Sequence, residues 1–215
     1  MAKRDQLDAA EKSSSLFPLF LKLEGRRCLV VGAGSIAESK IRGLLESGAD
    51  VRVVAPEAKA AVREWTHAGQ IRWDARPFQP SDLDGAFLVI AATSLSSLNA
   101  IVFREARERG VLCNAVDDPE NCDFYYPAVV RRGHLQIAIS TAGHSPALAQ
   151  HLREQLEAQF VPDYAAWIEE LGQARRELFS CDMDPEARRR LLHELASRRP
   201  GRLQNEKAQE TPNAG

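Results

Sequence analysis

A glycine-containing loop at 32–37, with the sequence GAGSIA, lies between a short apolar run and a helical pattern. It fits the spacing G-x-G-x-x-G/A, in which each small residue has a separate task. Gly32 permits a tight turn, Gly34 lets the backbone approach a pyrophosphate, and Ala37 allows close packing of helix on strand. The N-terminus of the helix attracts phosphate through its free N–H groups. The spacing predicts dinucleotide binding, and the alternative is a structural turn that has lost its nucleotide.

The residues after the second predicted strand decide which dinucleotide is favoured. An acidic residue there binds the ribose hydroxyls of NAD, whereas an arginine accommodates the 2′-phosphate of NADP. The strand ends on Ala55, and Pro56 and Glu57 follow. Glu57 either reaches the ribose or is a solvated loop carboxylate. No arginine occupies this turn, and the nearest, Arg52, lies within the strand, so NAD is favoured over NADP.

Polar residues also follow two later predicted strands, namely Thr93 after the fourth and Asn114 to Asp118 at the end of the fifth. Ligands of a doubly wound sheet bind beyond the carboxyl ends of its strands. Asp117 would therefore face the nicotinamide, where a carboxylate can accept a proton or orient a substrate. The alternative is that Asp117 and Asp118 only shape the turn before Pro119. The sequence contains neither Tyr-x-x-x-Lys nor G-x-S-x-G, which other enzymes use.

The elements that must position these residues alternate between two periods. Short apolar runs predict buried strands, and stripes of period 3.6 predict helices. The strands are expected at 28–32, 51–55, 71–75, 87–92 and 111–116, and the helices at 35–47, 59–67 and 96–109. The stripes include Ile36 in the first helix and Ile101 in the third among the inward-facing residues. This alternation predicts an α/β protein with an N-terminal Rossmann-like parallel sheet.

The pattern changes after Asp118. Two β-rich runs, 124–130 and 135–141, are joined by 131–134 and predict a hairpin, although Pro127 suits only an edge or a bulge. Three helices are expected at 145–160, 164–179 and 185–198. The predicted domains are an NAD-binding domain at 16–118, a β-hairpin dimerisation region at 119–145 and a helical domain at 146–199, between disordered ends at 1–15 and 200–215.

Composition excludes several classes of protein. The chain has 215 residues, of which 44% are hydrophobic and 27% charged, and a net charge of −2. It is therefore neither fibrous nor disordered overall, and it lacks the basic excess of a nucleic-acid-binding protein. No apolar run approaches the ~20 residues of a membrane-spanning helix. Cys28 and Cys113 lie in strand-like runs and no C-x-x-C occurs, which indicates free thiols, a cytoplasmic location and no metal site.

Three stretches together resemble one known family. They are VVGAGSIAESK at 30–40, VVAPE at 53–57, and NAVDDPENCDFYYPAVVRRGHLQIAISTAGHSPALAQHLREQLE at 114–157. In this order they are similar to the siroheme-synthase-type precorrin-2 dehydrogenases and sirohydrochlorin ferrochelatases. The resemblance runs from about 17 to 160, and 114–157 is its most specific part. It implies a Rossmann domain, a central dimerisation region and a helical C-terminal domain, assembled as a homodimer.

The resemblance also implies roles for particular residues. The family's key aspartate is the last residue of the motif N-x-V-D, which is Asp117 in this chain. Asn114 of the same motif and Thr141 are candidate substrate contacts, and His144 is either a substrate contact or a variable loop side chain. For Arg131 and Arg132, considered below as substrate contacts because of their charge, the alternative is a solvated turn. The family's nucleotide contacts fall on Ser35, Ile36, Pro56 and Glu57, with a further contact near Ala92 and Thr93.

The activity that the resemblance implies is oxidation of precorrin-2 by NAD to sirohydrochlorin, followed in some members by insertion of Fe²⁺ as a substrate. The tetrapyrrole bears eight carboxylates, so a net charge of −2 requires a local basic patch, for which Arg131, Arg132 and His134 are candidates, with His151 and Arg153. The chain is too short for an additional methyltransferase domain. Two alternatives stay open: a non-catalytic NAD-sensing dimer, and an NAD-dependent oxidoreductase acting on another substrate.

Overall fold

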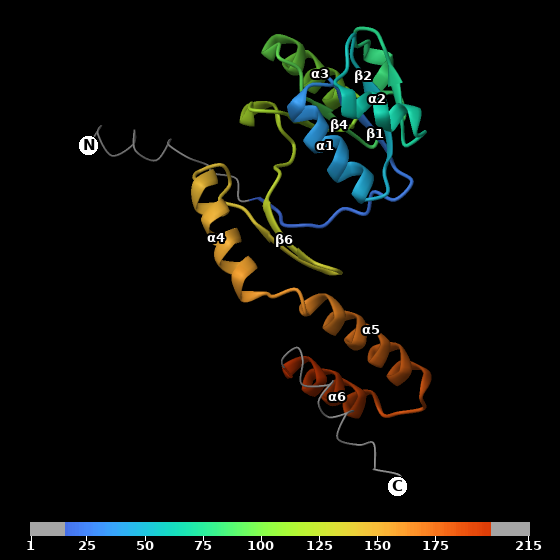
Figure 1. Cartoon of the computed structure of the whole chain (residues 1–215), viewed down its shortest axis with the longest axis vertical. Helices are drawn as coiled ribbons and strands as arrows, with labels where there is room; N and C mark the ends of the chain where they lie inside the picture. Colours follow the sequence, from blue (N-terminus) through green and yellow to red (C-terminus); the bar gives the residue numbers. More distant parts are fainter. Residues whose placement is uncertain (1–15, 199–215) are drawn as a thin grey trace, which may run out of the picture. The chain divides into compact units, whose positions relative to one another are not determined.

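The computed structural model describes residues 16–198 and divides the chain into two compact units, with the boundary between Tyr125 and Tyr126 (Figure 1). The segments predicted to be disordered, 1–15 and 200–215, lie outside the described residues. The finer division predicted from the sequence, into regions at 16–118, 119–145 and 146–199, stays a prediction. Each unit is described by itself below.

Unit 1 is built on a five-stranded parallel sheet with the order β3-β2-β1-β4-β5. This confirms the predicted α/β class, and the strands lie within two residues of their expected bounds. The strands are β1 (Arg27–Val31), β2 (Asp50–Val54), β3 (Ile71–Asp74), β4 (Leu88–Ala91) and β5 (Leu112–Ala115), and the helices are α1 (Ser35–Glu46), α2 (Ala60–His67) and α3 (Ser96–Glu108). Two short 3₁₀ helices, η1 (Pro80–Leu83) and η2 (Pro119–Asn121), were not predicted.

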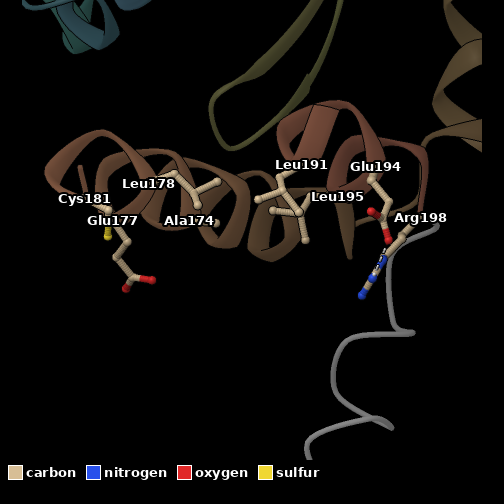
Figure 2. Close-up of a pocket in the computed structure, with 8 residues that line it drawn as sticks. All are labelled: Ala174, Glu177, Leu178, Cys181, Leu191, Glu194, Leu195 and Arg198. Carbon is tan, nitrogen blue, oxygen red and sulfur yellow. Dashed lines mark hydrogen bonds and ion pairs between the residues drawn. The ribbon is translucent and has the colours of Figure 1, made fainter. Parts of the chain in front are cut away.

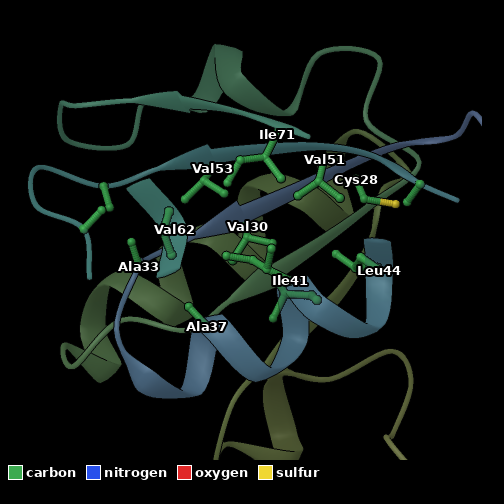
Figure 3. Packing of buried hydrophobic residues seen from close by; sticks show 14 of the residues in the cluster. Cys28, Val30, Ala33, Ala37, Ile41, Leu44, Val51, Val53, Val62 and Ile71 are labelled. Atoms are coloured by element: carbon green, nitrogen blue, oxygen red, sulfur yellow. The ribbon is translucent and has the colours of Figure 1, made fainter. Parts of the chain in front are cut away.

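The sheet is buried on both faces because its strands are apolar at successive positions. In β1, Cys28 and Val30 belong to one core cluster, whereas Leu29 and Val31 belong to the other. Figure 3 shows the first cluster, in which Val30 packs with residues of the two helices α1 and α2. The second cluster lies against α3. The core therefore lies in two layers, one on each side of the strands.

Two residues predicted to face the core are exposed. Ile36 is 50% exposed and Ile101 is 39% exposed. In α1 the buried positions are Ala37, Ile41 and Leu44, so the apolar stripe begins one residue later. In α3 the inward position is taken by a polar residue, Asn99, which is only 4% exposed. Ile41 and Leu44 in α1 and Val102 and Ala106 in α3 are buried, so the period was right and only one residue at the edge of each stripe was misplaced.

A charged network joins β2, β3 and η1 on one side of unit 1. Asp82 accepts hydrogen bonds from Arg52 at 3.0 Å, from Arg76 at 2.9 Å and from the backbone N–H of Gln79 at 2.9 Å. The side chain of Asp82 is 2% exposed, whereas those of both arginines are 34% exposed. Arg52 also donates to Asp74 at 3.0 Å. Arg52 therefore has a structural role inside the sheet layer.

Unit 2 begins with an antiparallel hairpin of β6 (Ala128–Arg132) and β7 (Leu135–Ile139). The predicted first strand, 124–130, was wrong at its start, since Pro127 has no N–H to donate and Phe124 uses its carbonyl elsewhere. Arg131 and Arg132, predicted as part of the connection, are strand residues, and only Gly133 and His134 form the turn. The second strand ends at Ile139 rather than 141, where the chain turns through Ala142 at φ 50°.

Three helices complete unit 2: α4 (Pro146–Gln159), α5 (Tyr164–Ser180) and α6 (Pro185–Ser197). Their starts agree with the sequence, because Ser145 caps α4 and Asp184 caps α6 through bonds from Leu148 and Ala187. Within residues 16–198, none of the helices combines the length and apolar character needed to cross a membrane.

Candidate active site

The site lies at the carboxyl edge of the sheet, where four strands end at one level. The N–H of Gly32 donates to Val54 O at 2.9 Å, that of Ala92 to Val31 O at 2.8 Å, and that of Val116 to Ala91 O at 2.9 Å. These bonds continue the strand register past β1, β4 and β5. The loops that carry the predicted site residues of unit 1 therefore start side by side.

The glycine loop has the geometry that its spacing predicts. Gly32 has φ 108°, and a Cβ there would lie 2.4 Å from Ala92 O, so only glycine fits. A Cβ on Gly34 would meet nothing within 4 Å, which leaves open space above an exposed loop. Ala37 is fully buried, which allows α1 to pack closely on the sheet. The loop thus fits a dinucleotide, whose pyrophosphate would lie in the open space before the first N–H groups of α1.

The turn after β2 lies against the same loop. Pro56 and Glu57 are exposed there, beside Ser35 and Ile36, which are also exposed. The backbone N–H of Lys59 donates to Ala33 O at 3.2 Å, and its Nζ donates to Ser35 Oγ. The predicted nucleotide contacts of the two loops are therefore brought together. Lys59 was missed, although a lysine shortly after the second strand of a dinucleotide-binding unit is a signal that could have been found.

The loop after β4 is held by a buried amide. The Asn99 Oδ1 atom accepts from Thr93 N at 3.2 Å and from Thr93 Oγ1 at 2.7 Å, while Asn99 Nδ2 donates to Thr93 O at 3.2 Å. Thr93 is partly exposed and Ala92 packs on Gly32. Asn99 therefore fixes the backbone of the predicted contact at Ala92 and Thr93. Sequence reasoning missed Asn99, because an Asn on an apolar stripe reads as a break in the pattern.

Asp117 is exposed and has φ 61°, in the left-handed region that few residues other than glycine adopt. The turn is closed by Asp118 N, which donates to Ala115 O at 3.2 Å. Burial lowers the pKa of Lys40 on α1, and the negative charge of Asp117 opposes this effect. The carboxylate of Asp117 thus acts electrostatically on the helix that follows the glycine loop.

The segment after Asp117 folds back on β5. Asn114 is buried and its Nδ2 donates to Phe124 O at 2.7 Å and to Cys122 Sγ at 3.3 Å. The thiol of Cys122 donates to Ala115 O and Asp118 O at 3.1 and 3.2 Å, and burial raises its pKa. These contacts tie the Asp117 turn to the end of β5 and to Cys122. The predicted role of Asn114 in substrate binding stays a prediction, and its contacts are with the protein.

In unit 2, the predicted substrate contacts have different surroundings. Arg132 donates to the carbonyls of Phe160 at 2.7 Å and Glu157 at 3.0 Å, and so binds the C-terminus of α4. Arg131 and His144 are exposed. Thr141 accepts from Ser145 N at 3.2 Å and orders the turn before α4. Arg131 and His144 are therefore accessible to a ligand, whereas Arg132 is engaged within unit 2.

A cavity of about 340 Å³ between α5 and α6 contains none of the predicted site residues. Figure 2 shows Leu178, Leu191 and Leu195 along it, with the charged side chains of Glu177, Glu194 and Arg198 beside them. Within residues 16–198, no three His, Cys, Asp or Glu side chains are grouped to hold a metal ion.

Comparisons with known proteins agree with this geometry. A family model for a putative NAD(P)-binding domain matches residues 19–128, and one for the central part of a sirohaem biosynthesis protein matches 132–159. The siroheme synthase of Photorhabdus laumondii is 46% identical over 141 residues, which are 66% of this chain and 30% of that protein. Siroheme synthase 1 of Aeromonas hydrophila is 39% identical over 180 residues, 84% of this chain and 39% of that protein.

The chain therefore spans about a third of the length of these curated relatives. Among solved structures, SirC, a precorrin-2 dehydrogenase, matches with a TM-score of 0.74 and 30% identity, over 84% of this chain and 89% of its own. The NAD(P)-binding model covers half of the chain, and SirC is matched over nearly its whole length. The chain belongs to the family of siroheme-synthase-type precorrin-2 dehydrogenases.

Proposed function

We propose that this protein oxidises precorrin-2 to sirohydrochlorin with NAD. One observation carries the proposal: an exposed aspartate, Asp117, is held at positive φ at the same sheet edge as a glycine loop open to a pyrophosphate. The match to SirC, which is a precorrin-2 dehydrogenase, supports the choice of substrate. The relatives called siroheme synthases support a place in siroheme biosynthesis.

The chain's own residues would hold the cofactor along the glycine loop. The open space at Gly34 and the first N–H groups of α1 suit the pyrophosphate, and the turn at Pro56 and Glu57 suits the adenosine ribose. NAD, when bound, supplies the acceptor for one hydride from the reduced macrocycle. The backbone of Ala92 packs against Gly32 of this loop, and Asn99 holds the neighbouring Thr93 in place.

Asp117 would accept the proton that precorrin-2 releases on oxidation. Oxidation of precorrin-2 to sirohydrochlorin removes two electrons as a hydride, together with one proton. An ionised carboxylate beside the substrate can accept that proton, and general-base assistance of this kind accelerates a reaction by about 10²–10⁴-fold. The bonds of Cys122 and Asp118 hold the backbone of the turn that carries this carboxylate. In the ferrochelatase step that some family members add, the same carboxylate would accept pyrrole protons as Fe²⁺ enters.

The substrate's carboxylates require cations, and we assign these to unit 2. Arg131 is exposed, and the nearby His134 side chain, 80% exposed, lies 2.9 Å from Glu169. Arg131 is the strongest candidate because none of the described carboxylates forms an ion pair with it. Thr141 and His144, in the turn before α4, are further candidates. The role of Arg132 would be to position the end of α4.

We also propose that the protein is a cytoplasmic homodimer. Phe17 and Phe20 in unit 1, and Phe179 and Leu191 in unit 2, are exposed apolar residues that a second copy could cover. All four cysteines are free, which suits a reducing compartment. Sedimentation at micromolar concentration checks the dimer, and a monomer there would contradict it.

The deciding experiment incubates the protein with precorrin-2 and NAD and follows both sirohydrochlorin absorbance and NADH formation. Asp117→Asn should lower the rate at least about a hundredfold while NAD binding is retained. Glu120→Gln, at an exposed carboxylate in η2 directly after the Asp117 turn, is the matched control and should keep its rate. A fully active Asp117→Asn variant would overturn the role of Asp117. Tight NAD binding without turnover would favour an NAD sensor, and turnover of a different substrate another oxidoreductase.

A further inference from the structure

Lys59 is a cation placed at the glycine loop, and it has no carboxylate partner within residues 16–198. It stands at the N-cap of α2, and its Nζ donates to Ser35 Oγ at the first residue of α1. Its backbone N–H donates to Ala33 O at 3.2 Å, so main chain and side chain both face the loop. The N-termini of two helices and one ammonium group therefore point at the same region.

Several other cations of unit 1 are paired with carboxylates. Arg52 and Arg76 are paired with Asp82, and Arg72 with Asp50 at 2.9 Å. Among residues 16–198, no ion pair is formed by Lys59, whose side-chain bond is to a neutral hydroxyl. A hydroxyl can rotate to donate to an anion that the ammonium also binds. The two side chains can thus both donate to one negatively charged group.

We propose that Lys59, together with Ser35, binds a phosphate group of the dinucleotide. This inference rests on the proposed function, because it takes the glycine loop as the cofactor site. Lysine binds phosphate as a compact point charge, and open space at Gly34 lies next to Ser35. Two phosphates have this chemistry: the pyrophosphate shared by NAD and NADP, and the 2′-phosphate of NADP alone. Glu57, exposed in the same turn, disfavours the second by charge repulsion.

The test measures binding of NAD⁺ and of NADP⁺ by calorimetry, with no tetrapyrrole present. Lys59→Gln removes the charge from an exposed N-cap position that makes no side-chain cap, so folding should be unaffected. We expect its Kd for the bound dinucleotide to rise about tenfold, as for the loss of one charged hydrogen bond. Lys59→Arg should stay within about threefold of the unmodified chain. Arg72→Gln is the matched control for net charge, because Arg72 is an exposed cation of β3 that pairs with Asp50 at the opposite end of β2.

Each outcome decides the matter. An equal rise in Kd for NAD⁺ and NADP⁺ assigns Lys59 to the pyrophosphate, and a rise for NADP⁺ alone assigns it to the 2′-phosphate. Unchanged affinities in Lys59→Gln, or an equal loss in Arg72→Gln, would overturn the role of Lys59 while leaving the cofactor assignment intact. If the unmodified chain bound neither dinucleotide, the cofactor assignment would fall as well.

Discussion

The two units of this chain differ in how completely they bury their apolar residues. Except for Val130 and Ala149, every hydrophobic residue that the structure buries lies in unit 1. Helices α5 and α6 have no buried residue. In unit 2 the indole N–H of Trp167 is also buried without a hydrogen-bond partner in the described structure. Unit 1 therefore has a core of its own, whereas unit 2 buries few of its apolar residues.

This difference in burial bears on where a catalytic group can be held rigidly. A catalytic group must be held in place by neighbours that do not move, and a buried sheet with converging loops provides them. Asp117 is fixed through Asp118, Cys122 and the end of β5, all within unit 1. In unit 2, by contrast, Arg131 is exposed and forms no ion pair with the described carboxylates. Three perturbations test how far the contrast extends.

The largest effect is expected from Gly32→Ala. The new Cβ would lie 2.4 Å from Ala92 O on a residue with φ 108°, so unit 1 must distort. We expect a loss of at least about 3 kcal/mol in the free energy of unfolding, measured by urea denaturation. Gly34→Ala is the matched variant, because its Cβ meets nothing within 4 Å. It should leave stability within about 1 kcal/mol but weaken NAD binding, and equal destabilisation by both would contradict the assignment of separate tasks.

The next prediction compares the stability lost when one apolar side chain is truncated in each unit. Ile41 is fully buried in α1, and Ile41→Ala should lower the free energy of unfolding by about 2–5 kcal/mol. Leu195 is half-buried beside the cavity between α5 and α6. Leu195→Ala should therefore lower the free energy of unfolding by only about 1 kcal/mol or less. Unfolding is followed by circular dichroism at low protein concentration. Equal losses would mean that unit 2 has a complete core, and a loss at Leu195 that grows with concentration would indicate burial by a second copy.

Sequence patterns predicted unit 1 well because its elements are encoded locally. The strands came from apolar runs, and the glycine loop and Asp117 came from short motifs next to strand ends. Asn99, Lys59 and Cys122 were missed because their partners, Thr93, Ser35 and the carbonyl of Ala115, are set by tertiary contacts. The start of β6 was misplaced for the same kind of reason. An apolar run such as FYYPAVV carries no sign that its first half is bound to β5.

The smallest effect concerns one ion network in each unit. Burial alone would raise the pKa of Asp82, but hydrogen bonds from Arg76 and Gln79 N–H and the charges of Arg76 and Arg52 lower it below its ordinary value. A lowered folded-state pKa contributes stability above the unfolded-state pKa, about 4, and that stability is lost as pH falls through the folded-state value. Asp82→Asn should therefore cost about 1–2 kcal/mol at pH 7, less than a fully buried pair because both arginines are 34% exposed.

The difference between Asp82→Asn and the unmodified chain should shrink below about pH 4, where the carboxylate of the unmodified chain is itself protonated. Glu157 in unit 2 is the counterpart, with a pKa lowered by its hydrogen bond from Arg153. Its side chain is 43% exposed, so Glu157→Gln should change the pH profile in the same direction but by less. Urea denaturation between pH 3 and 7 measures both. An effect of Glu157→Gln as large as that of Asp82→Asn would mean that unit 2 shields its charges as well as unit 1, which its exposed surfaces argue against.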